Sequence, residues 1–220
     1  MYSMQIDPAL LETYPEIRLG CLTFEAQVRP SDPEFWAYLD DTVLPVIRQN
    51  IEGKAWSQIS GIRGSRAAYK AFGRNPGRYR VSSEALLRRV RRGDELYHIN
   101  SVVDVNNLVS VESGLSVGSY DLAAIDGPIL LRKANAGEGY NSIGKDFLDL
   151  ENLLVLSDQQ GIFGSSMSDS TRAMVTGATN RVLVVIYCFE NAIDLDALLD
   201  RAKEAFTTYA GAQNIECWSL

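Results

Sequence analysis

The longest unbroken apolar run in this chain, residues 182–189, has the length of a β-strand. A membrane-spanning helix needs about 20 apolar residues in succession, and no stretch of the sequence approaches that length. Two further segments rich in aliphatic residues, 129–133 and 153–158, are separated from it by glycine-containing turns. These segments predict a β-rich second half and no membrane partner.

Helical patterns dominate the first half. Ser31 is a candidate N-cap for a helix that has Pro33 in its first turn. Residues 57–72 predict a second helix. Residues 82–92 predict a third, which Gly93 ends.

The two ends of the chain carry further elements. Apolar residues alternate over residues 17–28 with a change of phase after Cys21, which predicts a bulged strand. Residues 195–209 have the pattern of an amphipathic helix, and residues 215–218 that of an edge strand.

Because helices mostly precede strands, the order of elements predicts an α+β fold with a largely antiparallel or mixed sheet packed by helices. No repeat or biased linker divides the sequence, so we expect one domain over residues 1–220. Within it, residues 1–55 form an N-terminal strand and helix extension, residues 56–190 the core, and residues 191–220 a C-terminal helix and edge strand.

The composition, with 46% hydrophobic and 22% charged residues, is that of an ordinary globular protein. Cys21, Cys188 and Cys217 are far apart in the sequence and odd in number, unlike the cysteines of a disulfide framework. Since His98 is the only histidine, a Cys/His zinc site is hard to build, and we expect no metal and no cofactor. The first residues lack a basic leader with an apolar core, so a cytoplasmic protein is expected.

The net charge of −7 conceals a strong local asymmetry. Residues 63–92 contain ten basic residues and one acid, Glu84, so this window carries +9 and the remaining residues carry −16. Such a basic face on an acidic body favours a polyanionic partner. Pairing of these arginines with acids elsewhere in the fold is an equally open interpretation of the charge alone.

Spacing within the basic window favours RNA. Arg63, Arg66 and Lys70 stand at i, i+3 and i+7, which puts them on one face of a helix. Arg88 and Arg92 lie one turn apart on the next helix. Guanidinium groups interspersed with aromatic rings suit phosphates and unstacked bases. The predicted RNA-binding residues are Arg63, Arg66, Lys70, Arg88, Arg89 and Arg92.

A longer motif starts at Ser101 and reads SVVDVNNLVSVESG. It is followed by GSYD at 118–121, LRKA at 131–134 and GIFG at 161–164. This order of segments resembles the B3/B4 domain of the β subunit of phenylalanyl-tRNA synthetase, in the branch of small free-standing proteins that carry the domain alone. The VVDVNN segment is helical in that family. The resemblance therefore implies a helix over residues 102–111, where β propensity alone predicts a strand, packed under a sheet that contains residues 129–133 and 182–189.

The resemblance also implies a substrate pocket. In the synthetase, the domain hydrolyses tyrosine wrongly attached to the phenylalanine tRNA, and a histidine and a glutamate assist. Gly118 stands at the histidine position and Met167 at about the glutamate position, so both groups are absent. Tyrosine is then not the expected substrate, because an unpaired buried hydroxyl costs about 1–3 kcal/mol. The implied pocket residues are Asn106, Gly118, Tyr120, Ser165, Ser166 and Met167.

Other polar residues leave the chemistry open. Asn106 and Asn107, with Asp104 and Asp121, suit the positioning of an ester or a water, and equally suit helix capping. The serines of residues 165–170 lack a histidine that would activate a nucleophile. No catalytic residue is assigned.

The leading hypothesis is a tRNA-binding protein, related to the synthetase editing domain, that hydrolyses mischarged aminoacyl-tRNA in trans. Such hydrolysis needs a positioned water and oriented donors rather than a nucleophilic side chain. The alternatives are a non-catalytic module that binds RNA or an amino-acid-like ligand, and an enzyme acting on an unrelated small molecule.

Overall fold

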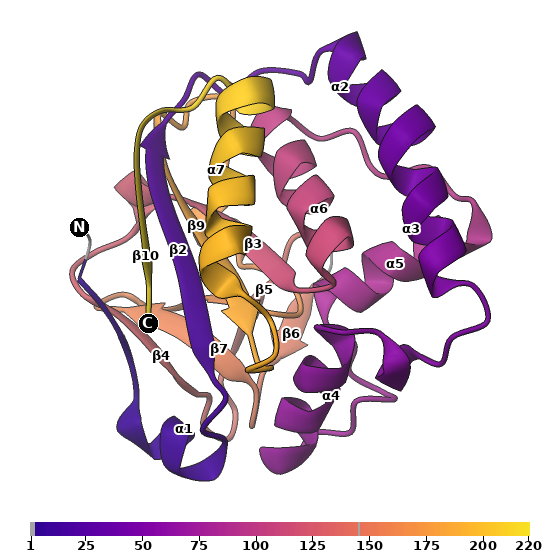
Figure 1. The fold of residues 1–220 in the computed structure, drawn as a ribbon. Coiled ribbons are helices and arrows are strands. Elements are labelled where there is room, and N and C mark those ends of the chain that lie inside the picture. Colours follow the sequence, from indigo (N-terminus) through magenta and orange to yellow (C-terminus); the bar gives the residue numbers. More distant parts are fainter. Residues whose placement is uncertain (1–2, 145) are drawn as a thin grey trace.

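The computed structural model describes residues 3–144 and 146–220 and has an α+β fold with antiparallel and mixed sheets, as predicted (Figure 1). Its strands are β1 (Met4–Ile6), β2 (Arg18–Glu25), β3 (Ser116–Asp121), β4 (Ile129–Lys133), β5 (Gly139–Asn141), β6 (Phe147–Asp149), β7 (Leu154–Asp158), β8 (Gly161–Ser165), β9 (Arg181–Cys188) and β10 (Gln213–Ser219). Its α-helices are α1 (Pro8–Thr13), α2 (Pro33–Tyr38), α3 (Leu44–Ile51), α4 (Ile62–Ala71), α5 (Ser82–Arg92), α6 (Ser101–Ser113) and α7 (Leu195–Ala210).

Two four-stranded sheets, a two-stranded sheet of β5 and β6 and a helical layer build the molecule. One sheet has the order β10-β2-β9-β3 and is antiparallel throughout. The other has the order β1-β4-β7-β8, in which only β1 and β4 are parallel. The expectation that residues 129–133 and 182–189 share one sheet is therefore wrong, because β4 and β9 lie in different sheets.

The composition of β9 explains this layering. Val182, Val184 and Ile186 pack in one buried cluster with residues of α6 and α7. Leu183 and Val185 pack in a second cluster with residues of β4, β7 and β8. A strand that is apolar on both faces must be covered on both faces, so β9 lies between the helices and the second sheet.

The strand β2 is buried in the same two-sided way. Leu19 and Cys21 belong to the cluster between the sheets, whereas Leu22 and Phe24 belong to the cluster under the helices. All eight residues pair one to one with β9. The change of phase after Cys21 thus reflects burial of both faces, and the predicted bulge in β2 is absent from this ladder.

The prediction of a helix over residues 102–111 is confirmed, since α6 spans Ser101–Ser113. The Asn100 side chain caps it by accepting hydrogen bonds from the backbone N–H groups of Val102 and Val103. Gly114 ends it in the left-handed conformation, with φ of 72°. Capping and burial outweigh the β propensity of its valines.

The earlier helices differ in detail from the sequence prediction. Asp32 occupies the N-cap position of α2, and the Ser31 hydroxyl instead donates to the Asp104 carboxylate at 2.6 Å. Within residues 57–72, a 3₁₀ turn precedes α4, because Gly61 takes φ of 79° and interrupts the helix. The helix α5 ends at Gly93 as predicted.

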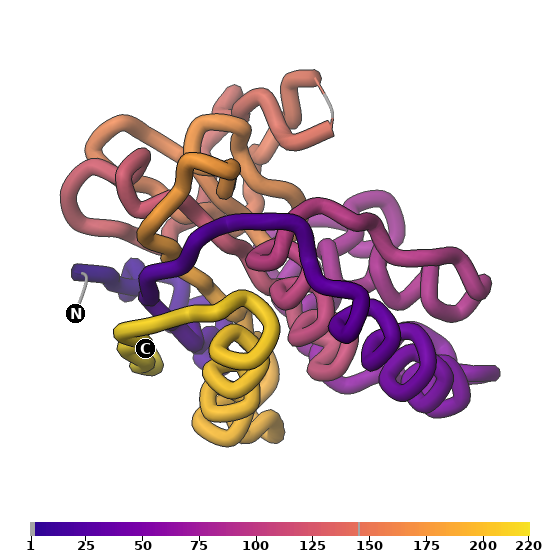
Figure 2. Tube along the Cα trace, turned by 90° about the horizontal axis from the view of Figure 1, so that it is seen from above, coloured from indigo at the N-terminus to yellow at the C-terminus, as the bar shows by residue number. Residues whose placement is uncertain are grey.

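Both ends of the chain contribute to the sheets. The N-terminal residues supply β1 and β2, and the C-terminal residues supply β10, which pairs with β2. Figures 1 and 2 show the two chain ends on the same side of the molecule, away from α2 and α3. Among the residues that the structure describes, no helix has the length and apolar character needed to cross a bilayer.

Candidate functional site

A pocket of about 630 Å³ opens between α5, α6, the edge strand β3 and the segment that follows β8. Its walls are mainly apolar. They include Leu86, Val103, Val117, Met167, Met174 and Val175. The packing of α5 and α6 against β3 therefore leaves a cavity large enough for an amino-acid side chain and more.

Arginines border this pocket. Arg80, Arg88, Arg89 and Arg92 all line it. Among the described residues, Arg89 bonds only to neutral groups, the Glu95 carbonyl oxygen and the Tyr97 hydroxyl, so no described acid offsets its charge. Its guanidinium carbon lies 4.3 Å from the centre of the Tyr97 ring. Arg92 forms an exposed ion pair with Asp94, which screens its charge weakly.

Glu84 joins the basic residues of α4 and α5. Its carboxylate is 1% exposed and accepts from Arg66 at 2.9 Å and from Arg88 at 2.8 Å. Two guanidinium groups on one carboxylate leave a net positive charge. The paired interpretation of the arginines thus holds in part, without removing the positive character of the pocket border.

The other predicted RNA-binding residues on α4 lie apart from the pocket. Arg63 forms an ion pair with Glu190, which also accepts from the Gly61 backbone N–H. Lys70 is exposed and does not line the pocket. Of the six residues, only Arg88, Arg89 and Arg92 border the cavity.

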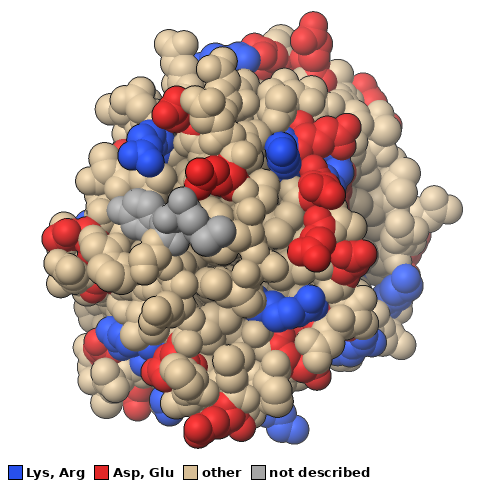
Figure 3. Space-filling model, turned by 60° about the vertical axis from the view of Figure 1, so that its left-hand side comes forward, with Lys and Arg blue, Asp and Glu red and all other residues tan. Residues whose placement is uncertain are grey.

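Acidic residues are prominent on another side of the molecule. Figure 3 shows Asp and Glu in a band right of centre, with Lys and Arg interspersed, on the face that is at the left in Figure 1. Polyanions approaching that face would meet more repulsion than at the border of the pocket.

Asp169 places a carboxyl group in the pocket. Its Oδ1 accepts from the Tyr120 hydroxyl at 2.7 Å and from the Ser165 backbone N–H at 3.2 Å. Burial raises the pKa of Asp169 to about 7 against the lowering effect of these two donors. The sequence interpretation missed this residue, although it follows Met167 by only two positions. A carboxyl group is therefore present, and the argument against tyrosine from its absence is withdrawn.

Tyr120 lies beneath the pocket instead of lining it. It is fully buried, and its hydroxyl also bonds the Tyr187 hydroxyl at 2.9 Å. A Cβ on Gly118 or on Gly164 would come within 3 Å of the Tyr120 hydroxyl and ring. Gly118 thus leaves room for this tyrosine, and the neighbouring Ser119 lines the pocket in its place.

The turn after β8 divides its residues between the pocket and the core. Ser165 and Met167 line the pocket. Ser166 is buried and bonds the Tyr69 hydroxyl at 2.9 Å, so it is turned away from the predicted place. The Ser165 hydroxyl donates to the Ser168 carbonyl at 3.0 Å and accepts from Tyr140. These contacts describe a structural serine and not an activated nucleophile.

The two asparagines of α6 line the pocket in different ways. Asn106 donates from Nδ2 to the Val117 carbonyl at 2.9 Å, whereas its buried Oδ1 has no partner within residues 3–144 and 146–220. The side chain of Asn107 makes no hydrogen bond to the described residues. Asp104 accepts from Ser31 and the Ile99 backbone, and Asp121 caps the turn at Ala123. Of these four polar residues, only the asparagines are placed to contact a ligand.

Two further groups considered for chemistry lie elsewhere. The His98 ring stacks on Trp36, with centroids 3.5 Å apart, and does not line the pocket. Within residues 3–144 and 146–220, no group of three or more His, Cys, Asp or Glu side chains could hold a metal ion.

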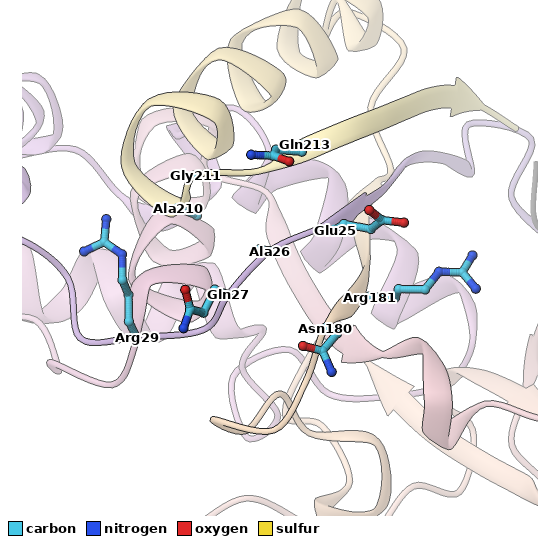
Figure 4. A pocket seen from close by; sticks show the side chains of 9 residues that line it. All are labelled: Glu25, Ala26, Gln27, Arg29, Asn180, Arg181, Ala210, Gly211 and Gln213. Carbon is cyan, nitrogen blue, oxygen red and sulfur yellow. The ribbon is translucent and has the colours of Figure 1, made fainter.

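A second hollow of about 620 Å³ lies where β2 ends, β9 begins and α7 turns into β10. Figure 4 shows that the charged ends of Arg29 and Arg181 extend away from each other there. Because its polar side chains diverge, this hollow offers no converging set of ligand groups. The pocket at α5 and α6 is the better candidate site.

The part of the chain that is similar to known proteins contains this pocket. Residues 64–198 match the family model described as the B3/4 domain. Every pocket-lining residue from Arg80 to Val175 falls inside the matched range.

Relatives of known identity are phenylalanine–tRNA ligase β subunits. The one from Legionella pneumophila is 32% identical over 139 residues, which are 57% of this chain and 17% of the relative. The one from Bifidobacterium longum is 33% identical over 105 residues, 44% of this chain and 12% of the relative. The matched segments thus cover less than a fifth of these relatives.

Among solved structures, an N-terminal fragment of the phenylalanyl-tRNA synthetase β subunit from Pyrococcus horikoshii aligns with a TM-score of 0.48 and 13% identity. The alignment covers 97% of this chain and 50% of that one. The family model alone spans more than half of the present sequence. On that match, the chain belongs to the B3/4 domain family.

Proposed function

We propose that the pocket binds the aminoacylated 3′ end of a tRNA and that the protein hydrolyses the ester of a mischarged amino acid. The distribution of chemistry across the pocket carries this proposal. Cationic side chains border it, apolar side chains form its walls, and one carboxyl group lies within it. An aminoacyl-tRNA end has the matching order of phosphates, nucleoside and amino acid. The relatives, named as phenylalanine–tRNA ligase subunits, point to the same class of ligand.

The border suits the last nucleotides. Arg80 and Arg89 are available for phosphates, since neither is paired with an acid among the described residues. Tyr97 and Ile99 are 56% and 57% exposed and line the same pocket. Exposed rings and aliphatic side chains provide stacking surfaces for unpaired bases.

The interior suits ester hydrolysis by water. In that reaction the water oxygen bonds to the ester carbonyl carbon, and the bond from that carbon to the ribose oxygen breaks. One proton of the water ends on the ribose hydroxyl, and the other is released from the new carboxylic acid. The Asn107 amide and the Ser119 hydroxyl line the pocket as donors for the carbonyl oxygen, on which negative charge develops.

A second candidate is binding without chemistry. No histidine is among the residues that line the pocket. The Ser165 hydroxyl already donates to the Ser168 carbonyl, so it is not paired with a general base. Both observations favour this candidate. Hydrolysis then depends entirely on water positioning and oriented donors.

The test is deacylation of a panel of tRNAs, each charged with one radiolabelled amino acid, measured against spontaneous loss of the ester. We expect faster loss for at least one apolar amino acid. Val103→Trp fills the pocket and should abolish the acceleration. Val46→Trp, at a 56% exposed position on α3, is the matched control and should leave it unchanged. Binding without acceleration would favour the second candidate, and no binding would contradict both.

A further inference from the structure

Two hydrogen-bond acceptors in the pocket lack donors. Asn106 is 6% exposed, and its Oδ1 has no hydrogen-bond partner among the residues that the structure describes. Asp169 receives both of its hydrogen bonds on Oδ1, and no described residue donates to Oδ2. Buried polar atoms are nearly always paired in folded proteins, so the buried Asn106 Oδ1 points to a ligand that supplies a donor, and the partly exposed Asp169 offers that ligand a second acceptor in the same pocket.

Both acceptors are held next to the same residue of β3. Asn106 bonds the carbonyl of Val117, which adjoins Gly118 in the chain. Asp169 bonds the Tyr120 hydroxyl, which occupies the space that a side chain on Gly118 would take. Both residues also line the one pocket, so a ligand held there can meet both acceptors.

The surroundings of Asp169 favour a cation over a neutral donor. Burial holds its pKa at about 7 although two neutral donors already bond it. Tyr120, Tyr187 and Tyr140 surround it, and the pKa of each is raised far above the physiological range, so they stay neutral. Tyr69, whose pKa is about 12, also stays neutral. The charged groups of the same pocket are the arginines Arg80, Arg88, Arg89 and Arg92.

We propose that Asp169 and Asn106 form a subsite for the α-ammonium group of an aminoacyl ligand whose side chain is apolar. An ammonium carries three N–H donors and one positive charge, so it can satisfy both acceptors and the carboxylate charge at once. A side-chain hydroxyl has one hydrogen and no charge, so it can satisfy only one acceptor. The apolar walls then receive an aliphatic side chain. The subsite deepens the proposed function and rests on it for the nature of the ligand.

The probe pair is 3′-(leucylamino)-3′-deoxyadenosine and its desamino counterpart, 3′-(4-methylpentanoylamino)-3′-deoxyadenosine. Neither has an ester, so binding is measured by calorimetry without hydrolysis. We expect the wild-type protein to bind the leucyl probe at least about tenfold more tightly. Asp169→Asn preserves both acceptor contacts of Oδ1 and should reduce the preference to less than about threefold. Asp126→Asn, at an exposed position outside the pocket, is the control and should keep the full preference.

The pH dependence gives a readout on the wild-type protein alone. Between pH 7.5 and 5.5 the amine becomes more fully charged, which by itself would strengthen binding of the leucyl probe. Protonation of Asp169 acts in the opposite direction, so the preference should fall by about tenfold. A preference that rises on acidification would overturn the subsite.

The outcomes separate this inference from the proposed function. Equal binding of the two probes overturns the subsite, even where deacylation of tRNA is observed. A strong preference that Asp169→Asn removes supports the subsite, even where no tRNA is deacylated. A tyrosyl probe that binds more tightly than a phenylalanyl probe only while Asp169 is present would assign the carboxylate to a side-chain hydroxyl and overturn the proposal. Binding of no probe contradicts both proposals.

Discussion

Tyr120 connects the buried core to the pocket through its hydroxyl. The hydroxyl lies between Gly118 and Gly164, bonds Tyr187 and orients Asp169. Because Gly118 and Gly164 have no side chains, the Tyr120 hydroxyl has room to hydrogen-bond and position the Asp169 carboxyl group.

Replacing Gly118 by alanine should therefore destabilise the protein, because the added Cβ would lie within 3 Å of the Tyr120 side chain. Overpacking of this kind costs about 1–3 kcal/mol. Tyr120→Phe removes the nearest of the contacting atoms, so the double variant should lose less than the sum of the two single changes. Urea denaturation of the four proteins measures this coupling, and strict additivity would contradict the contact.

The pKa of Asp169 predicts a pH-dependent stability. Its folded-state pKa is raised from 3.8 to about 7. Its contribution to folding is thus fully present below about pH 4 and is lost as the pH rises through 7. Asp169→Asn has no such dependence, so its stability relative to wild type should improve by about 2 kcal/mol between pH 5 and 7. A difference in unfolding free energy between the two proteins that is the same at pH 5 and pH 7 would contradict the raised pKa.

At the scale of elements, one ion pair, Arg66–Glu84, joins α4 to α5, and a second, Arg88–Glu84, lies within α5 at the border of the pocket. Glu84 is buried between Arg66 and Arg88, whereas the Arg92–Asp94 pair is exposed. Loss of the Glu84 carboxylate would leave partly buried guanidinium groups without a partner, whereas the charges of the Arg92–Asp94 pair are exposed to water whether or not the pair forms.

Replacing Glu84 by glutamine should consequently destabilise the protein by about 3 kcal/mol, because two partly buried guanidinium groups lose their carboxylate. Asp94→Asn is the matched control on the exposed pair and should cost less than about 1 kcal/mol. Thermal unfolding compares them. Similar losses for both variants would mean that Glu84 does not hold the two helices together.

Most helices and strands could be predicted from the sequence, whereas the layers that pack against them could not. Residues 182–189 carry a strand signal in their composition, but the same apolar run does not reveal that two layers cover it. The helix α6 could be predicted only through family resemblance, because its capping by Asn100 competes with valine propensity. In the site, Asn106, Ser165 and Met167 line the pocket, whereas Gly118 and Tyr120 were misplaced by the alternation of faces along β3.

At the scale of the whole molecule, positive charge and an apolar cavity coincide on one side. Acidic side chains are prominent on another side (Figure 3). An RNA end would therefore be attracted in one orientation, and its binding would depend on salt.

Replacing Arg80 and Arg89 together by alanine should flatten the plot of log affinity for tRNA against log salt by about one to two units. These arginines line the pocket and have no acidic partner among the described residues. The pair Arg181→Ala and Lys203→Ala removes two exposed charges elsewhere and should leave the slope unchanged. Equal slopes for the pocket pair and wild type would contradict an RNA role for this border.

The most direct measurement locates the aminoacyl end itself. A tRNA whose 3′ end carries a diazirine analogue of leucine through an amide bond is photo-crosslinked to the protein, and the modified residues are identified by mass spectrometry. The account predicts cross-links on α5, α6, β3 and residues 165–175. Cross-links in the hollow formed by residues 25–29, 180–181 and 210–213, or a random distribution over the surface, would contradict it.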